Sequence, residues 1–199
     1  MGVEIEAKMR LHDRDAMIAR LESLGATLDA DLSETNSYFD TPMGKLKSTD
    51  QGLRTRVEVV GAGTPNEKVT TTITHKGPRA IGALKSRFET ELVADNAKDA
   101  ALLLVALGFD HVLSFEKRRT RYTLDQCHVE LDELPVLGRF IEIEGATEDV
   151  VTAVREKLGL TDEPMIRSSY IAMLRTHLQE THIEQSMICF EDTASVVKG

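Results

Sequence analysis

The chain has 199 residues, which suits one generous domain, and 41% of them are hydrophobic, which is enough to build a core. Its 24 basic and 33 acidic residues give a net charge of −9, which argues against nucleic-acid binding because that requires a basic surface. Two cysteines far apart in sequence, Cys127 and Cys189, predict reduced thiols rather than a disulfide framework or a zinc site. No apolar leader and no run of about 18 apolar residues is found, so we expect a soluble, cytoplasmic protein without a membrane partner.

Apolar residues at helical spacing predict four helices, over residues 13–24, 98–107, 147–158 and 166–179. Alternating composition predicts strands over residues 3–9, 37–40, 53–60, 68–75, 86–93, 114–124, 129–132 and 139–144, with a hairpin loop at 61–66. Residues 181–199 show weak periodicity and form either a mobile tail or an arm that packs on a neighbour. We therefore predict one α+β domain over residues 1–180 and a C-terminal tail over 181–199.

Charged side chains occupy one face of six predicted strands, because side chains alternate along a strand with a period of two. The sets are Glu4, Glu6 and Lys8; Arg54, Arg56 and Glu58; Arg87, Glu89 and Glu91; Lys117, Arg119 and Arg121; Glu130 and Asp132; and Glu142 and Glu144. For any one strand the simplest interpretation is a solvated outer face. Recurrence in six strands, with both signs of charge, favours a shared interior instead.

A closed or nearly closed antiparallel eight-stranded barrel would provide that interior, with its apolar outer face covered by the helices. Carboxylates in such a lumen would hold hard divalent cations through oxygen, and lysine and arginine would hold phosphoryl oxygens. The chain has neither a G-x-x-x-x-G-K-[ST] loop nor a G-x-G-x-x-G loop. Any phosphate recognition must therefore come from strand side chains.

Several segments, in order along the chain, are similar to the signatures of the CYTH superfamily, the triphosphate tunnel metalloenzymes. Glu4-Ile5-Glu6-Ala7-Lys8 resembles the E-x-E-x-K signature of that family. The other matching segments are Tyr38-Phe39-Asp40-Thr41, Leu53-Arg54-Thr55-Arg56, Thr74-His75-Lys76-Gly77, Arg87-Phe88-Glu89-Thr90-Glu91, Lys117-Arg118-Arg119, Leu131-Asp132, the block from Leu137 to Glu144, and Ser169-Tyr170. The resemblance runs from about residue 2 to 178, and the tail has no recognised counterpart.

The resemblance implies roles for individual residues. Metal ligands for Mg²⁺ or Mn²⁺ would be Glu4, Glu6, Asp132, Glu142 and Glu144. Triphosphate-binding residues would be Lys8, Arg54, Arg56, Lys76, Arg87, Lys117 and Arg119. The catalytic group would be Glu4, Glu6, Lys76 and Asp132. Glu89 and Glu91 would orient the basic residues, and Arg118 would point outward.

Three functions follow from the resemblance as alternatives. The first is a class IV adenylate cyclase-like enzyme that converts ATP to cyclic AMP and pyrophosphate. The second, weighted almost equally, is a hydrolase of inorganic or thiamine triphosphate. The third is a non-catalytic module that binds nucleotide or polyphosphate. A homodimer is compatible with the sequence, which does not fix the oligomeric state.

Overall fold

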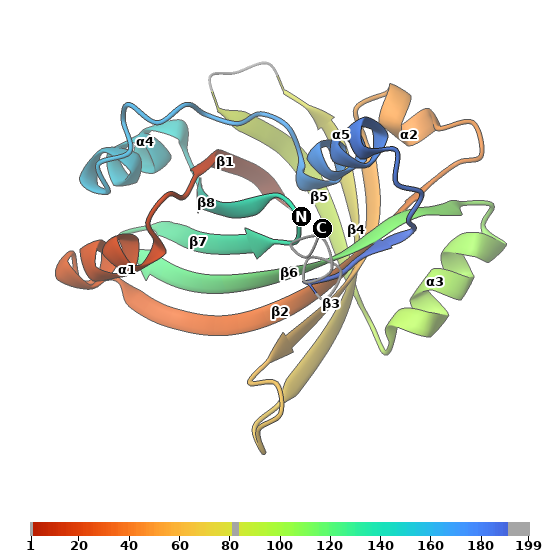
Figure 1. Ribbon diagram of the computed structural model, residues 1–199, viewed down its shortest axis with the longest axis horizontal. Helices are drawn as coiled ribbons and strands as arrows, with labels where there is room; N and C mark the ends of the chain where they lie inside the picture. The colour runs from red at the N-terminus through yellow and green to blue at the C-terminus, as the bar shows by residue number, and fades with distance from the viewer. Residues whose placement is uncertain (1, 81–83, 191–199) are drawn as a thin grey trace.

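The computed structural model describes residues 2–80 and 84–190, with the backbone alone at residues 2–4 and 85. Its strands are β1 (Gly2–Arg10), β2 (Thr27–Asp40), β3 (Gly52–Val60), β4 (Lys68–Arg79), β5 (Lys85–Ala94), β6 (Asp110–Leu124), β7 (Cys127–Leu134) and β8 (Gly138–Gly145). They pair antiparallel in the order β2-β3-β4-β5-β1-β8-β7-β6, and β2 also pairs with β6. The sheet is thereby closed into the eight-stranded barrel that the sequence predicts (Figure 1).

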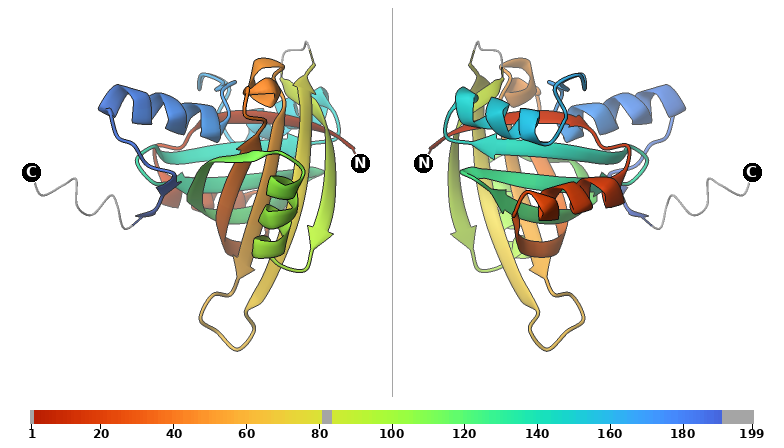
Figure 2. Two further views of the ribbon diagram at one scale, coloured as in Figure 1. Left: turned by 90° about the vertical axis from the view of Figure 1, so that its right-hand side faces the viewer. Right: turned by 90° about the vertical axis from the view of Figure 1, so that its left-hand side faces the viewer.

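The helices are α1 (Arg14–Ser23), α2 (Lys45–Ser48), α3 (Ala97–Ala106), α4 (Glu148–Lys157) and α5 (Tyr170–Thr181). Figure 2 shows α3 on one side of the barrel and α1 with α4 on the other. Helices α1 and α4 bury Leu21, Val151 and Val154 in the main cluster, where apolar side chains from the outer face of β1, β7 and β8 meet them. Helix α3 buries Leu104 against Phe39 and Leu53 in a smaller cluster. The apolar core therefore lies outside the barrel wall, which leaves the lumen for polar groups.

The lumen changes character along its length. The inward-facing positions of β6, β7 and β8 carry charge over most of the barrel, but near one end they carry Phe115, Leu134 and Phe140. These three side chains form a buried cluster with Tyr170 and Leu174 of α5. Helix α5 thus packs against one end of the lumen, whereas the other long helices cover the outer wall.

Several predicted elements differ from the structure at their ends, and the contacts explain two of these differences. The strand predicted over residues 37–40 begins ten residues earlier, because the polar stretch from Thr27 pairs along β6 on one side and, from Leu32, along β3 on the other. The helix predicted from residue 166 begins at Tyr170, since the amide of Ile166 donates to the carbonyl of Lys8 at 2.7 Å and Ser169 caps the first turn. The hairpin loop at residues 61–66 joins β3 to β4 as expected.

The chain continues past α5 into a ninth, two-residue strand, β9 (Met187–Ile188), which pairs parallel with β6 at Ser114 and Phe115. Part of the predicted tail thus packs on the barrel of its own chain, while residues 191–199 lie outside the described residues. No helix within the described ranges is long and apolar enough to cross a membrane.

Candidate active site

A cavity of about 750 Å³ occupies the lumen. Its lining combines eleven basic with nine acidic side chains, although the chain as a whole is acidic. The basic residues are Lys8, Lys47, Arg54, Arg56, Lys76, Arg79, Arg87, Lys117, Arg119, Arg121 and Arg175, and the acidic ones are Glu6, Asp40, Asp50, Glu58, Glu89, Glu91, Glu130, Glu142 and Glu144. The period-two alternation therefore brings charged faces from separate strands into one site.

The pairing of β1 with β8 sets acidic residues side by side. Glu6 lies directly opposite Glu144, and Lys8 lies opposite Glu142. The ammonium of Lys8 is 3.1 Å from a carboxylate oxygen of Glu142 and 3.9 Å from one of Glu6. Glu4 belongs to β1, but its side chain lies outside the described residues. Like charges in directly opposed positions destabilise a strand pair, so a cation at this position would relieve the repulsion.

The described carboxylates match a hard divalent cation in donor chemistry, since all supply oxygen. Among the side chains that the structure describes, which do not include that of Glu4, no three carboxylates, histidines or cysteines are arranged so that they could hold a metal ion together. Glu6, Glu142 and Glu144 therefore supply the type of donor atom that a divalent cation prefers. Their described side chains do not together form a complete coordination site.

Arg119 is the centre of a buried ion network. Its guanidinium donates two bonds of 2.6 Å to Asp132 and one of 2.6 Å to Glu142, and it also pairs with Glu130. Burial alone would lower the pKa of Arg119, but Asp132, Glu130 and Glu34 together raise that pKa well above its usual value. The guanidinium is thus charged and held in place. Asp132 belongs to the network without lining the cavity.

Glu34 joins the network although the sequence pattern did not single it out. The side chain is 2% exposed, and its carboxylate lies 3.0 Å from Lys117 and 3.2 Å from Arg56. Burial raises the pKa of Glu34, but Arg56, Lys117 and Arg119 lower it well below its usual value. Extending the alternation from Tyr38 back through Asn36 would have found this inward position. The strand signal there is weak, because polar residues dominate both faces.

Lys117 illustrates how tightly these charges are packed. The side chain is 1% exposed, and its ammonium contacts Glu34 at 3.0 Å and Asp132 at 3.4 Å. Burial and the neighbouring Arg119 lower the pKa of Lys117, while Asp132 and Glu34 oppose that shift. Because every change of charge here alters its neighbours, we expect these residues to act as a unit.

Arg54 and Arg87 lie outside the network around Arg119. They are 7% and 9% exposed, and both line the cavity. The Nε atom of each is buried and has no hydrogen-bond partner among the described residues. An unmade hydrogen bond on a buried donor costs about 1–3 kcal/mol. Such donors mark a position where an anionic ligand would be stabilised.

Lys76 lies on the neighbouring strand β4, where it pairs with Glu89. Thr74 of the same strand donates to Glu91 at 2.9 Å and accepts from Arg54 at 3.4 Å. Glu89 thus contacts a basic residue directly, whereas Glu91 is linked to Arg54 through Thr74. That these glutamates orient the basic residues stays a prediction.

The first turn of α5 and the two residues before it complete the wall of the cavity with Ser168, Ser169, Tyr170, Ile171 and Ala172. The hydroxyl of Tyr170 donates to Asp132 at 2.9 Å, and its ring lies 3.8 Å from the ammonium of Lys8. Burial and Asp132 raise the pKa of Tyr170 well above its usual value, so the phenol stays protonated and continues to donate.

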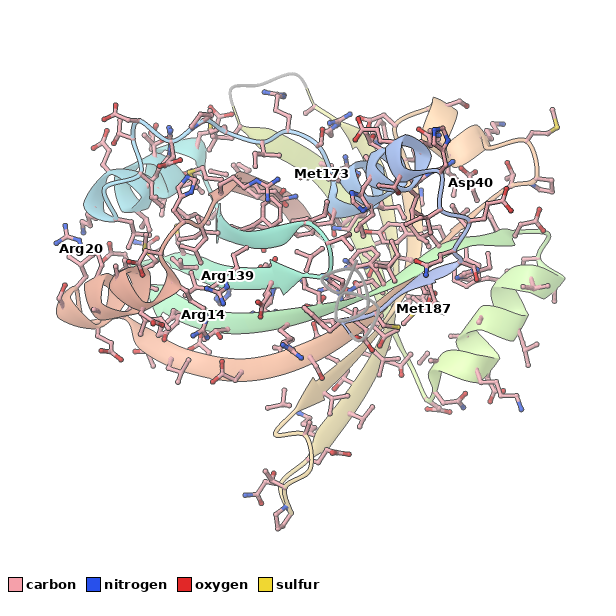
Figure 3. The ribbon with its side chains drawn as sticks, viewed as in Figure 1. Arg14, Arg20, Asp40, Arg139, Met173 and Met187 are labelled. Atoms are coloured by element: carbon pink, nitrogen blue, oxygen red, sulfur yellow. The ribbon has the colours of Figure 1, made fainter. Side chains whose placement is uncertain are left out.

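Two residues within the matching motifs make their main contacts outside the ion network. Arg118 has an outward-pointing side chain that is 62% exposed and lies over the ring of Phe190 at 4.0 Å, as the alternation predicts. Asp40 accepts from the backbone amides of Thr41, Leu46 and Lys47 and so holds α2 in position (Figure 3). The main contacts of Asp40 are therefore structural.

A closed antiparallel barrel whose lumen is lined by both carboxylates and buried cations defines a site for a polyanion and a hard cation. The chain belongs to the CYTH domain family, whose match covers residues 2–170. The adenylate cyclase CyaB of Aeromonas hydrophila is 32% identical over 185 residues, which cover 92% of this chain and 90% of that protein.

Solved structures resemble the whole barrel. A Pyrococcus horikoshii protein matches with a TM-score of 0.75 and 26% identity, over 87% of this chain and 99% of its own. HpAC1 of Hippeastrum, described as revealing a dominant triphosphatase activity, matches with a TM-score of 0.63 and 20% identity, over 87% and 96% of the two chains. That second likeness supports the fold alone. The family and the barrel predicted from the sequence are both confirmed.

Proposed function

We propose that this protein is an enzyme that binds a triphosphate in the barrel lumen and converts ATP to cyclic AMP and pyrophosphate. The observation that carries the proposal is the pair of buried guanidinium groups, Arg54 and Arg87, whose Nε donors lack partners among the described residues. A phosphoryl oxygen is an acceptor that matches an arginine donor in charge and geometry. Membership in a family with a relative named as an adenylate cyclase supports the same conclusion.

The side chains of the lumen account for the chemistry by positioning and by electrostatics. Arg54, Arg87 and Lys76 would hold the phosphoryl groups from β3, β4 and β5. Lys8, Arg56, Lys117 and Arg119 would offset the charge that builds on the leaving pyrophosphate when the ribose 3′-hydroxyl attacks the α-phosphorus. The buried carboxylates that already pair with these cations keep them in fixed positions, so little reorganisation is needed during the reaction.

Glu4, Glu6, Glu142 and Glu144 would hold the divalent cation, Mg²⁺ or Mn²⁺, with Asp132 as a further candidate. When bound, that cation would neutralise phosphoryl oxygens and polarise the reacting phosphorus. Lys8 contacts Glu142 and Glu6, so it would share these carboxylates with the cation.

The cavity also offers apolar surface near α5, where the half-buried side chains of Tyr38, Val112 and Ile171 line it. Inorganic triphosphate would leave this surface unused, whereas the organic part of a nucleotide would cover it. The surface therefore supports ATP over inorganic triphosphate. Hydrolysis of inorganic or thiamine triphosphate is the second candidate, favoured by the many cations, which recognise any triphosphate alike.

The test is to incubate the purified protein with ATP, thiamine triphosphate or inorganic triphosphate, each with Mg²⁺ or Mn²⁺, and to resolve the products. Cyclic AMP with pyrophosphate is the expected result, and orthophosphate without cyclic AMP would establish the hydrolase instead. Arg87→Ala should raise KM for the substrate at least tenfold, while the exposed Lys68→Ala should not. Tight triphosphate binding without turnover would identify a non-catalytic module and overturn the proposal.

Two further expectations belong to the proposal. The cytoplasm is the expected compartment, because two cysteines far apart in the sequence provide no disulfide framework. A homodimer stays a prediction, which the molar mass from light scattering would decide.

A further inference from the structure

The segment that follows α5 anchors the helix that forms part of the cavity wall. Helix α5 ends at His182, whose backbone is left-handed with φ of 55°, and the chain then turns back towards β6. Residues 186–190, here called the strap, run beside β6, where β9 pairs with Ser114 and Phe115. Figure 3 labels Met173 on α5 and Met187 on the strap, which lies beside β6.

Contacts along the strap fix it to the barrel. The amide of Ser114 donates to the carbonyl of Ser186 at 2.8 Å, and the amide of Phe190 donates to the carboxylate of Glu116 at 3.0 Å. The ring of Phe190 packs under the guanidinium of Arg118 at 4.0 Å. A cation over an aromatic ring at an exposed site contributes about 0.5–1 kcal/mol. A short segment thus makes three different attachments to one strand.

Ile188 links the strap to α5. Its side chain is 1% exposed and belongs to the same buried cluster as Leu174 and Tyr170. Burying such a side chain contributes about 1.5–3 kcal/mol. Among the described residues of α5 only Tyr170 and Leu174 are fully buried, and Ile188 shares their cluster with Phe115 and Phe140 of the barrel.

The other end of α5 is attached to a different part of the barrel. The carbonyl of Ser168 accepts from Lys8 at 3.3 Å, and the hydroxyl of Tyr170 donates to Asp132 at 2.9 Å. These contacts go to β1 and β7, whereas the strap goes to β6. Polar contacts therefore hold the start of α5, and its buried face packs in the apolar cluster that the strap enters through Ile188.

We propose that the strap is a positioning element for the active site, which through Ile188 holds α5 on the barrel and keeps Tyr170 and the first turn of α5 in the cavity wall. The strap lies beyond residue 170, where the family match ends. Its effect on turnover rests on the proposed function, but its effect on α5 does not.

The test compares Ile188→Asp with Ile183→Asp in the full chain, because Ile183 is 41% exposed and lies between α5 and the strap. Hydrogen exchange, followed by mass spectrometry, should accelerate at least tenfold in α5 of Ile188→Asp and stay unchanged in β1 and β8. Ile183→Asp should match the wild type, and Ile188→Val should restore slow exchange. If Ile188→Asp does not fold, Ile188→Ala serves in its place.

Kinetics give the second readout. Ile188→Asp should raise KM for the triphosphate substrate at least fivefold while kcat changes less than twofold, because the lumen charges stay in place and only part of the wall is lost. Unchanged exchange in α5, or equal acceleration in every strand, would overturn the proposal. If the wild type turns over no triphosphate, the proposed function fails, while the exchange experiment still decides the role of the strap.

Discussion

Neutralising Glu34 is the sharpest test of the buried ion network. The carboxylate lies 3.0 Å from Lys117 and 3.2 Å from Arg56, and all three side chains are largely buried. At an effective dielectric constant of about 20, each contact of roughly 3 Å amounts to about 5 kcal/mol. The cost of burying the charges cancels much of that energy, and loss of one partner from a buried pair costs about 3–5 kcal/mol. We therefore expect Glu34→Gln to lower the free energy of unfolding by about 3 kcal/mol.

A matched control exists on the neighbouring strand. Glu58 lies directly opposite Glu34 and also pairs with Arg56, at 3.4 Å, but its side chain is 25% exposed. Solvent screens such a pair, so Glu58→Gln should cost no more than about 1 kcal/mol. Urea unfolding of both variants, followed by circular dichroism, measures the difference. Equal losses in the two variants would refute the network as the source of the effect.

The stability difference between the wild type and Glu34→Gln should depend on pH in a definite direction. The pKa of Glu34 in the folded protein is below its ordinary value of 4.5, so the stability it contributes is complete above pH 4.5 and is lost as the pH falls below that value. The gap in unfolding free energy between wild type and Glu34→Gln should therefore be constant near neutral pH and shrink in acid. A gap that stays the same between pH 7 and pH 3 would contradict the assignment.

Three further predictions concern the β8 side of the barrel and its surroundings. Glu144→Gln should weaken Mn²⁺ binding at least tenfold in calorimetry without altering the circular dichroism spectrum, and unchanged binding would remove Glu144 from the metal ligands. Gly145→Ala should destabilise the fold by about 1–3 kcal/mol in thermal unfolding, because the added Cβ would lie 2.9 Å from the sulfur of Cys127 and 3.1 Å from Val151. Burial raises the pKa of the Cys127 thiol to about 11, so the reactive thiolate is scarce at pH 7.5. The rate of alkylation of Cys127, measured by peptide mass spectrometry, should therefore not exceed the rate at which the protein unfolds to expose it.

The lumen was predictable because strand periodicity is local. Charged residues at alternate positions of the motifs were expected to face inward. The structure places four of them along the cavity, namely Glu6, Lys8, Arg54 and Arg119. Glu34 was not predictable in the same way. Its strand has polar residues on both faces, so an amphipathic signal is missing although β2 is among the longest strands of the barrel.

The sequence by itself determined the barrel class, the inward face of each strong strand, and the combination of acidic and basic groups that points to a triphosphate. Only the tertiary structure decided the register that opposes Glu6 with Glu144, the burial of Asp132 behind Arg119, and the strap on β6. The physical reason is the separation along the chain between the residues involved. Alternation depends only on residues that are close in the sequence, whereas strand pairing and ion networks depend on groups that are far apart in the chain and meet only when the barrel closes.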